Sequence, residues 1–265
     1  MDGEGHFNGR RRPEMTLTLS SFALRVVSGL ARSSENVQAS FSAELAEQIV
    51  GYACSGDQGY LSDLYTGLQQ RRVTVDDVMD VYMLHAINVI GEAWHNEEID
   101  ILYASMACGR IQNLLRELGR ALASDTTGRV YDGRILLTVP VEEQHTLCAM
   151  LAANKLRRRG VSVKVMLLPR IEALCAMIDR SQVHAVFISV SNQTSLLPCA
   201  SMVQALRRAV SRNIPIVVGG GLVSSGIAGN DPRQIAEVTG ADVVTNDIEH
   251  ALQACGIQQL NVAAE

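Results

Sequence analysis

The pattern of hydrophobic and polar positions changes near the middle of the chain. Before residue 124, apolar residues recur at steps of three and four, as on one face of a helix. Beyond residue 128, short apolar runs alternate with helical stretches, and the segment between, Ser124-Asp125-Thr126-Thr127-Gly128, has the polar composition of a linker. The pattern predicts a helical domain over residues 15–124 and an α/β domain over residues 129–265.

The first domain is predicted to be a helical bundle. Its clearest helix begins at Thr74, where Thr74 and Asp77 fit a T-x-x-D capping pattern and the apolar residues up to Trp94 form a continuous face. A second helix is expected over residues 102–118, and two earlier helices, near 38–53 and 58–70, complete the bundle. Residues 1–14 are polar and glycine-bearing, which predicts a mobile tail.

The second domain contains five short apolar runs, which are typical of buried strands. They are Arg134–Pro140, Val161–Leu168, Ala185–Val190, Ile214–Val218 and Ala241–Val244. Helical stretches between and after them lie near 146–159, 171–181, 195–212, 232–238 and 247–255. This alternation predicts a five-stranded parallel sheet of flavodoxin/Rossmann-like order, covered by helices on both faces. In such a sheet, ligands bind beyond the carboxyl ends of the strands, near the switch between the first and third.

Three loops with distinctive residues should meet at that edge. The first strand leads into Glu143-Gln144-His145, the third into Ser189 to Ser195, and the fourth into Gly219-Gly220-Gly221. A carboxylate two residues before a histidine can accept one imidazole N–H and leave the other nitrogen free for a metal. The glycine run lacks the spacing of dinucleotide and P-loop motifs, which disfavours a nucleotide enzyme. A structural histidine and a bare glycine turn remain alternatives.

Composition narrows the class of protein. The 265 residues are 47% hydrophobic and 19% charged, with a net charge of −5, which argues against a general nucleic-acid coat. The basic runs Arg10–Arg12, Arg157–Arg159 and Arg207–Arg208 are interpreted as solvated helix ends or a flexible arm. Without a bilayer-length apolar run or a secretory signal, the sequence predicts a cytoplasmic protein without membrane contact.

The six cysteines are widely spread and show no zinc-ligand spacing. We interpret them as reduced core residues. Cys148 is the candidate for a redox role because it lies three residues after His145.

The three loops together resemble cobalamin-binding domains. The pattern of that family is D-x-H-x-x-G after the first strand, two serines six positions apart after the third, and G-G after the fourth. Here Glu143 stands for the aspartate, Cys148 for the glycine, and Ser189 and Ser195 keep the serine spacing. The resemblance implies that His145 is the axial cobalt ligand and that Glu143 is its hydrogen-bonding partner.

The cofactor's nucleotide tail is then expected beside Ser189, Ser191, Ser195 and the run Gly219, Gly220, Gly221. Cys148 could narrow the slot for this tail, because it replaces a glycine.

The resemblance extends over residues 35 to 256, because a four-helix cap before the cobalamin domain is also a family feature. Light-sensing members carry a W-x9-E-H motif whose tryptophan faces the cobalt. Here Trp94 is followed by His95, and Ala104-Ser105 replace the Glu-His pair. Trp94 is therefore expected over the corrin, with His95 as a candidate upper cobalt ligand after photolysis. A surface histidine at a helix end is the alternative for His95.

The segments EEQH and SVSNQTSL resemble the AerR/PpaA antirepressors of purple photosynthetic bacteria. This resemblance implies a non-enzymatic, light-responsive regulator that binds adenosylcobalamin or hydroxocobalamin. Its partner would be a CrtJ/PpsR-type repressor of photosystem genes, and direct DNA contact is left open. Two alternatives are a corrinoid carrier protein of a methyltransferase system and heme binding by the same scaffold.

Overall fold

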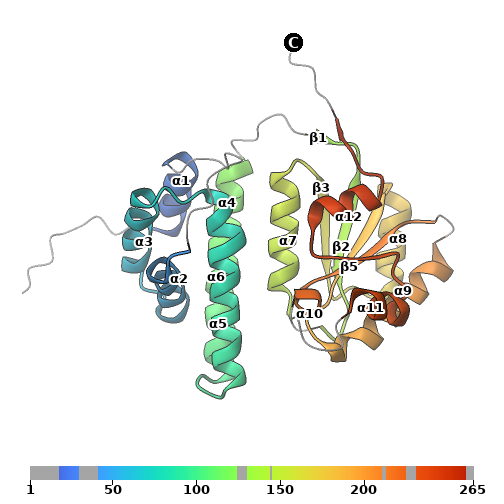
Figure 1. The fold of residues 1–265 in the computed structure, drawn as a ribbon, viewed down its shortest axis with the longest axis horizontal. Helices are drawn as coiled ribbons and strands as arrows, with labels where there is room; N and C mark the ends of the chain where they lie inside the picture. The colour runs from blue at the N-terminus through green and yellow to red at the C-terminus, as the bar shows by residue number, and fades with distance from the viewer. Residues whose placement is uncertain are drawn as a thin grey trace, which may run out of the picture.

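The computed structural model describes residues 18–29, 41–123, 130–143, 145–210, 213–224 and 231–260. The predicted tail, residues 1–14, and the predicted linker, residues 124–128, lie outside the described residues. In Figure 1 the first helices form a bundle on one side of the molecule, the sheet lies on the other, and α7 stands between them. None of the helices in the described ranges is both long and apolar enough to cross a membrane.

The N-terminal domain is a cap made only of helices over its described residues. These are α1 (Leu19–Gly29), α2 (Ala43–Ser55), α3 (Gly59–Gln70), α4 (Val75–Asp77), the π-helical turn η1 (Val78–Tyr82), α5 (Met83–His95) and α6 (Ile101–Ala123). The predicted bundle is confirmed, but it contains α1, which the periodicity did not predict, and the predicted helix at 38–53 begins only at Ala43. Their apolar faces meet in one core that includes Leu45, Leu64 and Ile111.

The helix that begins at Thr74 has the predicted capping box. The Thr74 side chain accepts a hydrogen bond from the Asp77 N–H, and the Asp77 side chain accepts one from the Thr74 N–H. The helical run then continues from α4 to α5 through η1, where the Met83 N–H donates to the Val78 carbonyl five residues back. Such π turns within α-helices are frequently found at functional sites.

The C-terminal domain is a doubly wound α/β unit. Its elements are β1 (Val130–Tyr131), β2 (Arg134–Val139), α7 (Leu147–Arg158), β3 (Ser162–Leu167), α8 (Ile171–Ser181), β4 (Ala185–Ser189), η2 (Gln193–Ser195), α9 (Leu196–Ala209), β5 (Ile216–Gly219), α10 (Gly221–Ser224), α11 (Pro232–Thr239), β6 (Val243–Val244), α12 (Ile248–Ala254) and β7 (Gln259–Leu260).

The main sheet has the predicted flavodoxin-like topology. Its order is β3-β2-β4-β5-β6, and every neighbouring pair is parallel. All five residues of β4 are buried, as expected for a central strand with helices on both faces. The switch point therefore lies between β2 and β4, where the chain leaves the sheet in opposite directions. Gly160 and Gly240 follow helices with positive φ, 87° and 72°, the left-handed conformation in which glycine commonly ends a helix.

Some local predictions are corrected by the structure. The glycine run is not a plain loop, because Gly219 ends β5 and Gly221 begins the short helix α10. A second, two-stranded antiparallel sheet joins β1 to β7, with Val130 opposite Leu260. Two short strands so far apart in the sequence carry no periodicity of their own, so the pairing could not be predicted.

Helix α7 packs against both the sheet and the cap. One face, with Ala149, Ala153 and Leu156, covers the sheet. The other face begins with Leu147, whose side chain is buried in the core of the cap. The cap and the sheet domain therefore share an apolar contact along this helix.

Candidate functional site

The predicted Glu143 and His145 form a hydrogen-bonded pair directly after β2. The Glu143 side chain is fully buried, whereas half of the His145 side chain is exposed. Glu143 Oε1 accepts hydrogen bonds from the His145 backbone N–H at 2.8 Å and from His145 Nδ1 at 2.9 Å. Because an ionised carboxylate only accepts, the ring hydrogen lies on Nδ1, and the lone pair of Nε2 is left free for a ligand.

Ser191, in the loop after β4, completes the arrangement. Its hydroxyl donates to Glu143 Oε1 at 2.6 Å, and its backbone N–H donates to Glu143 Oε2 at 2.9 Å. Glu143 thus accepts four hydrogen bonds from two loops that are 48 residues apart. These bonds connect the two strands that flank the switch point and fix the orientation of the imidazole ring.

The hydrogen bonds also set the ionisation of the pair. Burial alone would raise the pKa of Glu143, but the donors from His145 and Ser191 outweigh it and lower that pKa to about 2. The hydrogen bond to Glu143 raises the pKa of His145, although burial acts in the opposite direction. The carboxylate therefore stays charged and keeps the ring in the Nδ1–H form when the imidazole is neutral.

This geometry suits a metal ligand and not a serine nucleophile. The Ser191 hydroxyl oxygen lies 2.9 Å from His145 Nδ1, the nitrogen that also contacts Glu143. In a Ser-His-Asp triad the serine and the carboxylate use opposite ring nitrogens. Here both use the same one, so the other nitrogen is offered outward, as in histidines that bind a metal while a carboxylate holds them.

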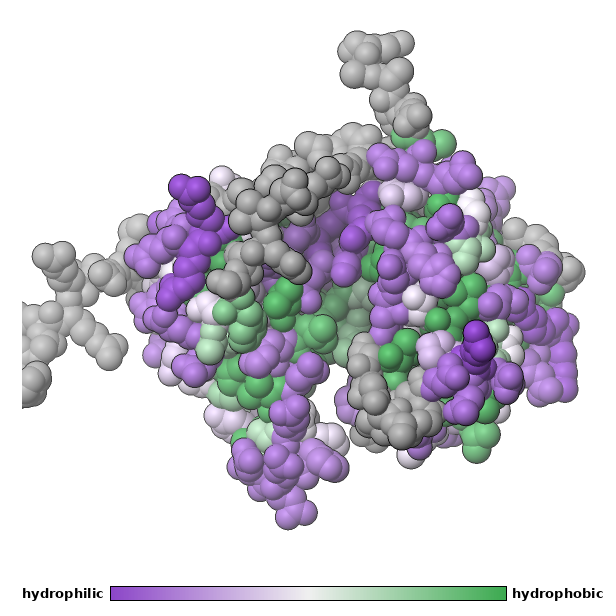
Figure 2. Space-filling model, in the orientation of Figure 1, coloured by the Kyte–Doolittle hydropathy of each residue, from purple (hydrophilic) through white to green (hydrophobic). Residues whose placement is uncertain are grey.

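A cleft of about 510 Å³ lies between the cap and the sheet domain. Its cap side is formed at four-residue steps along η1 and α5 by Asp80, Leu84, Asn88 and Glu92. Met79 also lines the cap side, and the other walls are α7, α12, strands β2, β4 and β5 and the loops after β5 and β6. Figure 2 shows hydrophobic residues gathered in the hollow between the two domains. The volume and apolar lining are those of a site for a small organic ligand.

The glycine run contributes to the rim of this cleft, with Gly219, Gly220 and Gly221 among the lining residues. The requirement for glycine, however, comes from the protein itself. Gly220 has φ +108°, and a Cβ there would lie 2.6 Å from the Val190 carbonyl oxygen. Gly220 therefore leaves room for the neighbouring loop, and the expected place of the glycine run beside a nucleotide tail stays a prediction.

Asn246, which was not among the predicted site residues, holds this turn. The Gly220 N–H donates to Asn246 Oδ1 at 2.7 Å, and Asn246 Nδ2 donates to the Gly220 carbonyl at 3.0 Å. The side-chain amide thus pairs with the backbone as a neighbouring strand would. Thr245, Asn246 and Asp247 follow the last strand and line the cleft. This polar tripeptide at a strand end was the available signal.

The remaining predicted residues of the sheet domain divide into two groups. Ser189 and Cys148 line the cleft. The pKa of the Cys148 thiol is raised, mainly by burial and also by the negative charge of Glu143. Ser195 is buried, donates to Asn192 Oδ1 at 3.2 Å and is not among the cleft-lining residues. Contact of Ser195 with a nucleotide tail stays a prediction. All six cysteines are free.

Trp94 and His95 lie at the end of α5, outside the lining of the cleft. The Trp94 side chain is 38% exposed, and His95 is exposed. The turn from α5 to α6 projects at the same end of the molecule as α10, which follows the carboxyl edge of the sheet (Figure 1). The structure thus brings the turn to the expected end of the molecule, and the roles of both residues stay predictions.

The residues present fit a corrinoid cofactor. A corrinoid brings most of its metal ligands with it, so the protein would need to supply one further donor, and the free Nε2 of His145 has the chemistry for it. His145 is not itself a lining residue of the apolar cleft, but Cys148, three residues later, and Ser189 are, and the cleft can take a nucleotide tail. In the described ranges, no cluster of three or more His, Cys, Asp or Glu side chains is arranged to hold a metal ion.

Comparison with known proteins agrees with this geometry. Residues 133–256 match the family described as B12 binding domain. Over 188 residues, the chain is 32% identical to an uncharacterized 20.5 kDa protein in the bchF-crtJ intergenic region of Rhodobacter capsulatus, which covers 70% of this chain and 93% of that protein. The monomethylamine corrinoid protein of Methanosarcina barkeri has the same fold, with a TM-score of 0.59 at 16% identity, over 80% of this chain and 94% of that one.

The match to the domain family covers the sheet domain, and the match to the Rhodobacter protein extends beyond it over most of the chain. The chain therefore belongs to the AerR/PpaA-like proteins, and its C-terminal domain is a cobalamin-binding domain.

Proposed function

We propose that this protein is a light-responsive transcriptional regulator that binds cobalamin and acts as an antirepressor on a CrtJ/PpsR-type repressor of photosystem genes. The observation that carries the proposal is the Glu143–His145 pair beside a cleft that the helical cap helps to form. The relative encoded between bchF and crtJ supports the regulatory part, because its position adjoins the gene of such a repressor.

The chain's own residues have separate tasks in this proposal. Glu143 and Ser191 orient the imidazole, and His145 Nε2 would hold the cobalt. Adenosylcobalamin, when bound, supplies a cobalt–carbon bond that light can cleave. The cleft, with Ser189 and the glycine rim, accommodates the nucleotide tail. The α5–α6 turn, which carries Trp94 and His95, is the part of the cap that would respond to a change above the ring.

Absorption spectroscopy tests the cofactor and the trigger. Wild-type protein is mixed with adenosylcobalamin, hydroxocobalamin or heme, passed through a desalting column, and measured in darkness and after illumination. We expect retention of cobalamin and a light-dependent change with the adenosyl form. Retention of heme alone, or no change on illumination, would contradict the proposal.

The regulatory role needs a second assay. A CrtJ/PpsR-type repressor is bound to promoter DNA, and the dark and illuminated protein is added. We expect release of the repressor in only one of the two states. Methyl transfer from the bound corrinoid to an acceptor, without any effect on the repressor, would instead identify a carrier protein of a methyltransferase system.

A further inference from the structure

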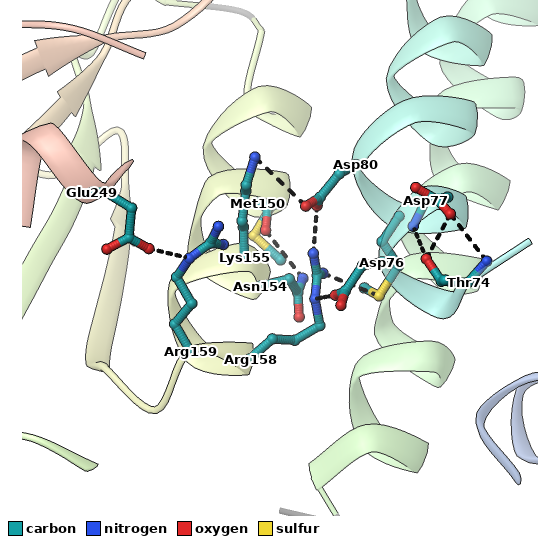
Figure 3. A network of polar contacts seen from close by, with 11 residues as sticks. Thr74, Asp76, Asp77, Asp80, Met150, Asn154, Lys155, Arg158, Arg159 and Glu249 are labelled. Atoms are coloured by element: carbon teal, nitrogen blue, oxygen red, sulfur yellow. Dashed lines mark hydrogen bonds and ion pairs between the residues drawn. The ribbon is translucent and has the colours of Figure 1, made fainter. Parts of the chain in front are cut away.

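The basic run at the end of α7 is more than the solvated helix end expected from the sequence, although Arg157 is exposed. Its three arginines contact three different parts of the fold. Arg157 donates to the Val163 carbonyl of β3, Arg159 forms an ion pair with Glu249 of α12 at 2.8 Å, and Arg158 contacts the cap. Figure 3 shows Arg158 and Lys155 directed from α7 toward the helix that carries Asp76 and Asp80. Only Arg158 of the three connects the two domains.

Arg158 is the centre of an ion cluster between cap and sheet domain. Its Nε atom lies 2.7 Å from Asp76 Oδ1, and its Nη2 atom contacts Asp80 Oδ1. Only 11% of the Arg158 side chain is exposed. Lys155, one turn earlier on α7, lies 3.5 Å from the other oxygen of Asp80. Two cations and two carboxylates therefore balance in this contact. Asp76 and Lys155 stay partly exposed, but Arg158 and Asp80 are largely buried, so removal of either of these two leaves an uncompensated charge in the contact.

This cluster is continuous with the cofactor cleft. Asp80 and Lys155 are both lining residues, and so is Met79, whose sulfur lies 3.2 Å from Arg158 Nη1. Lys155 lies seven residues beyond Cys148 on α7, a distance of about 10 Å along the helix. Asp80 lies in the π turn η1 and Asp76 in α4 directly before it, so the cap's share of the contact includes an irregular helical turn.

We propose that Asp76, Asp80, Lys155 and Arg158 form a latch that holds the cap on the cobalamin-binding domain and couples its position to occupancy of the cleft. This inference rests on the proposed function, because it takes the cleft to be the site of the cofactor's tail. Asp80 and Lys155 line the ligand cleft and also take part in the ion pairs between the two domains. A ligand that is bound more tightly in the latched state must, by reciprocity, stabilise that state.

Two measurements on the full-length chain test the latch. Hydrogen–deuterium exchange of peptides from η1–α5 and from α7 is recorded without cofactor and with hydroxocobalamin. The retention of hydroxocobalamin is followed by its absorption. The variants are Arg158→Gln and the near-isosteric Asp80→Asn, and the matched control is Arg159→Gln, which removes the same charge from the neighbouring residue but only a contact within the sheet domain.

In the latch variants we expect faster exchange in both segments of the cofactor-free protein and at least about tenfold weaker retention of hydroxocobalamin. Hydroxocobalamin should slow exchange of η1–α5 in the wild type and in Arg159→Gln, and much less in the latch variants. Wild-type exchange and retention in both Arg158→Gln and Asp80→Asn would overturn the proposal.

Faster exchange in the latch variants with unchanged retention would also overturn it, because the cluster would then be a domain contact without coupling to the cleft. Failure of the wild type to bind hydroxocobalamin would instead refute the proposed function, and the coupling with it. The exchange data on the cofactor-free protein would still decide whether the cluster holds the cap.

Discussion

Replacement of Glu143 by glutamine should remove a large acid-sensitive contribution to the free energy of unfolding. Glu143 Oε1 accepts three hydrogen bonds and Oε2 accepts one, from the Ser191 N–H. A glutamine side chain can place its oxygen where Oε1 lies, but its NH2 group then takes the place of Oε2 and faces the Ser191 N–H, so that two donors oppose each other. The variant therefore resembles the protonated form of Glu143 at every pH.

The magnitude follows from the pKa of Glu143, which falls from 4.5 to about 2. This shift corresponds to about 3 kcal/mol in favour of the folded carboxylate. Because the folded pKa is the lower one, the contribution is present above pH 4.5 and is lost as the pH falls toward 2. About 2 kcal/mol of it should be gone at pH 3.

Urea denaturation of the cofactor-free chain between pH 7 and pH 3, followed by circular dichroism, measures this contribution. The difference in unfolding free energy between wild type and Glu143→Gln should be about 3 kcal/mol at pH 7 and shrink to about 1 kcal/mol at pH 3. Glu142→Gln is the control, because Glu142 carries the same charge in the same loop but is exposed. A difference that stays constant with pH would refute the assignment of these four hydrogen bonds.

The other predictions concern the cofactor and its surroundings. His145→Ala should lose cobalamin or shift its absorption spectrum, while the far-ultraviolet circular dichroism stays unchanged. The cobalamin affinity of the wild type should fall as the pH drops below the raised pKa of His145, because a proton then occupies Nε2. This pH dependence should be absent in His145→Ala. Gly220→Val should lower both the melting temperature and the retention of cobalamin, because its Cβ would clash with the backbone of Val190. The control Gly221→Ala should melt nearly as the wild type does, because its Cβ would lie 3.3 Å from the nearest atom, the Ser191 carbonyl oxygen. Asn246→Ala removes the acceptor of the Gly220 N–H and one of the two donors to the Gly220 carbonyl, which keeps its hydrogen bond from the Val223 N–H. This variant should weaken cobalamin binding by about 1–2 kcal/mol in a titration, and equal affinity would exclude a role for this turn. If His95 binds cobalt after photolysis, illuminated wild type and His95→Ala should differ in absorption and in repressor affinity, and identical results would leave it a surface residue.

The sequence by itself determined the features that depend on local periodicity. The alternation of short apolar runs and helices indicated the parallel sheet, because strands buried on both faces must be apolar throughout. The position of Glu143 and His145 after the first strand then placed them at the switch point, since the topology of such sheets brings the carboxyl ends together. The Thr74 cap was equally local, because it needs only two residues three positions apart.

Tertiary structure decided which distant side chains meet. Ser191 contacts Glu143, whereas Ser195, the second serine of the six-residue spacing, is buried and donates to Asn192 Oδ1. Asn246 hydrogen-bonds to Gly220, 26 residues away in the sequence, and Arg158 contacts Asp80, 78 residues away. In a run of three arginines, the sequence pattern does not show which side chain faces solvent and which contacts a neighbouring helix. Its role depends on where α7 lies against the cap, which only the packing of two domains establishes.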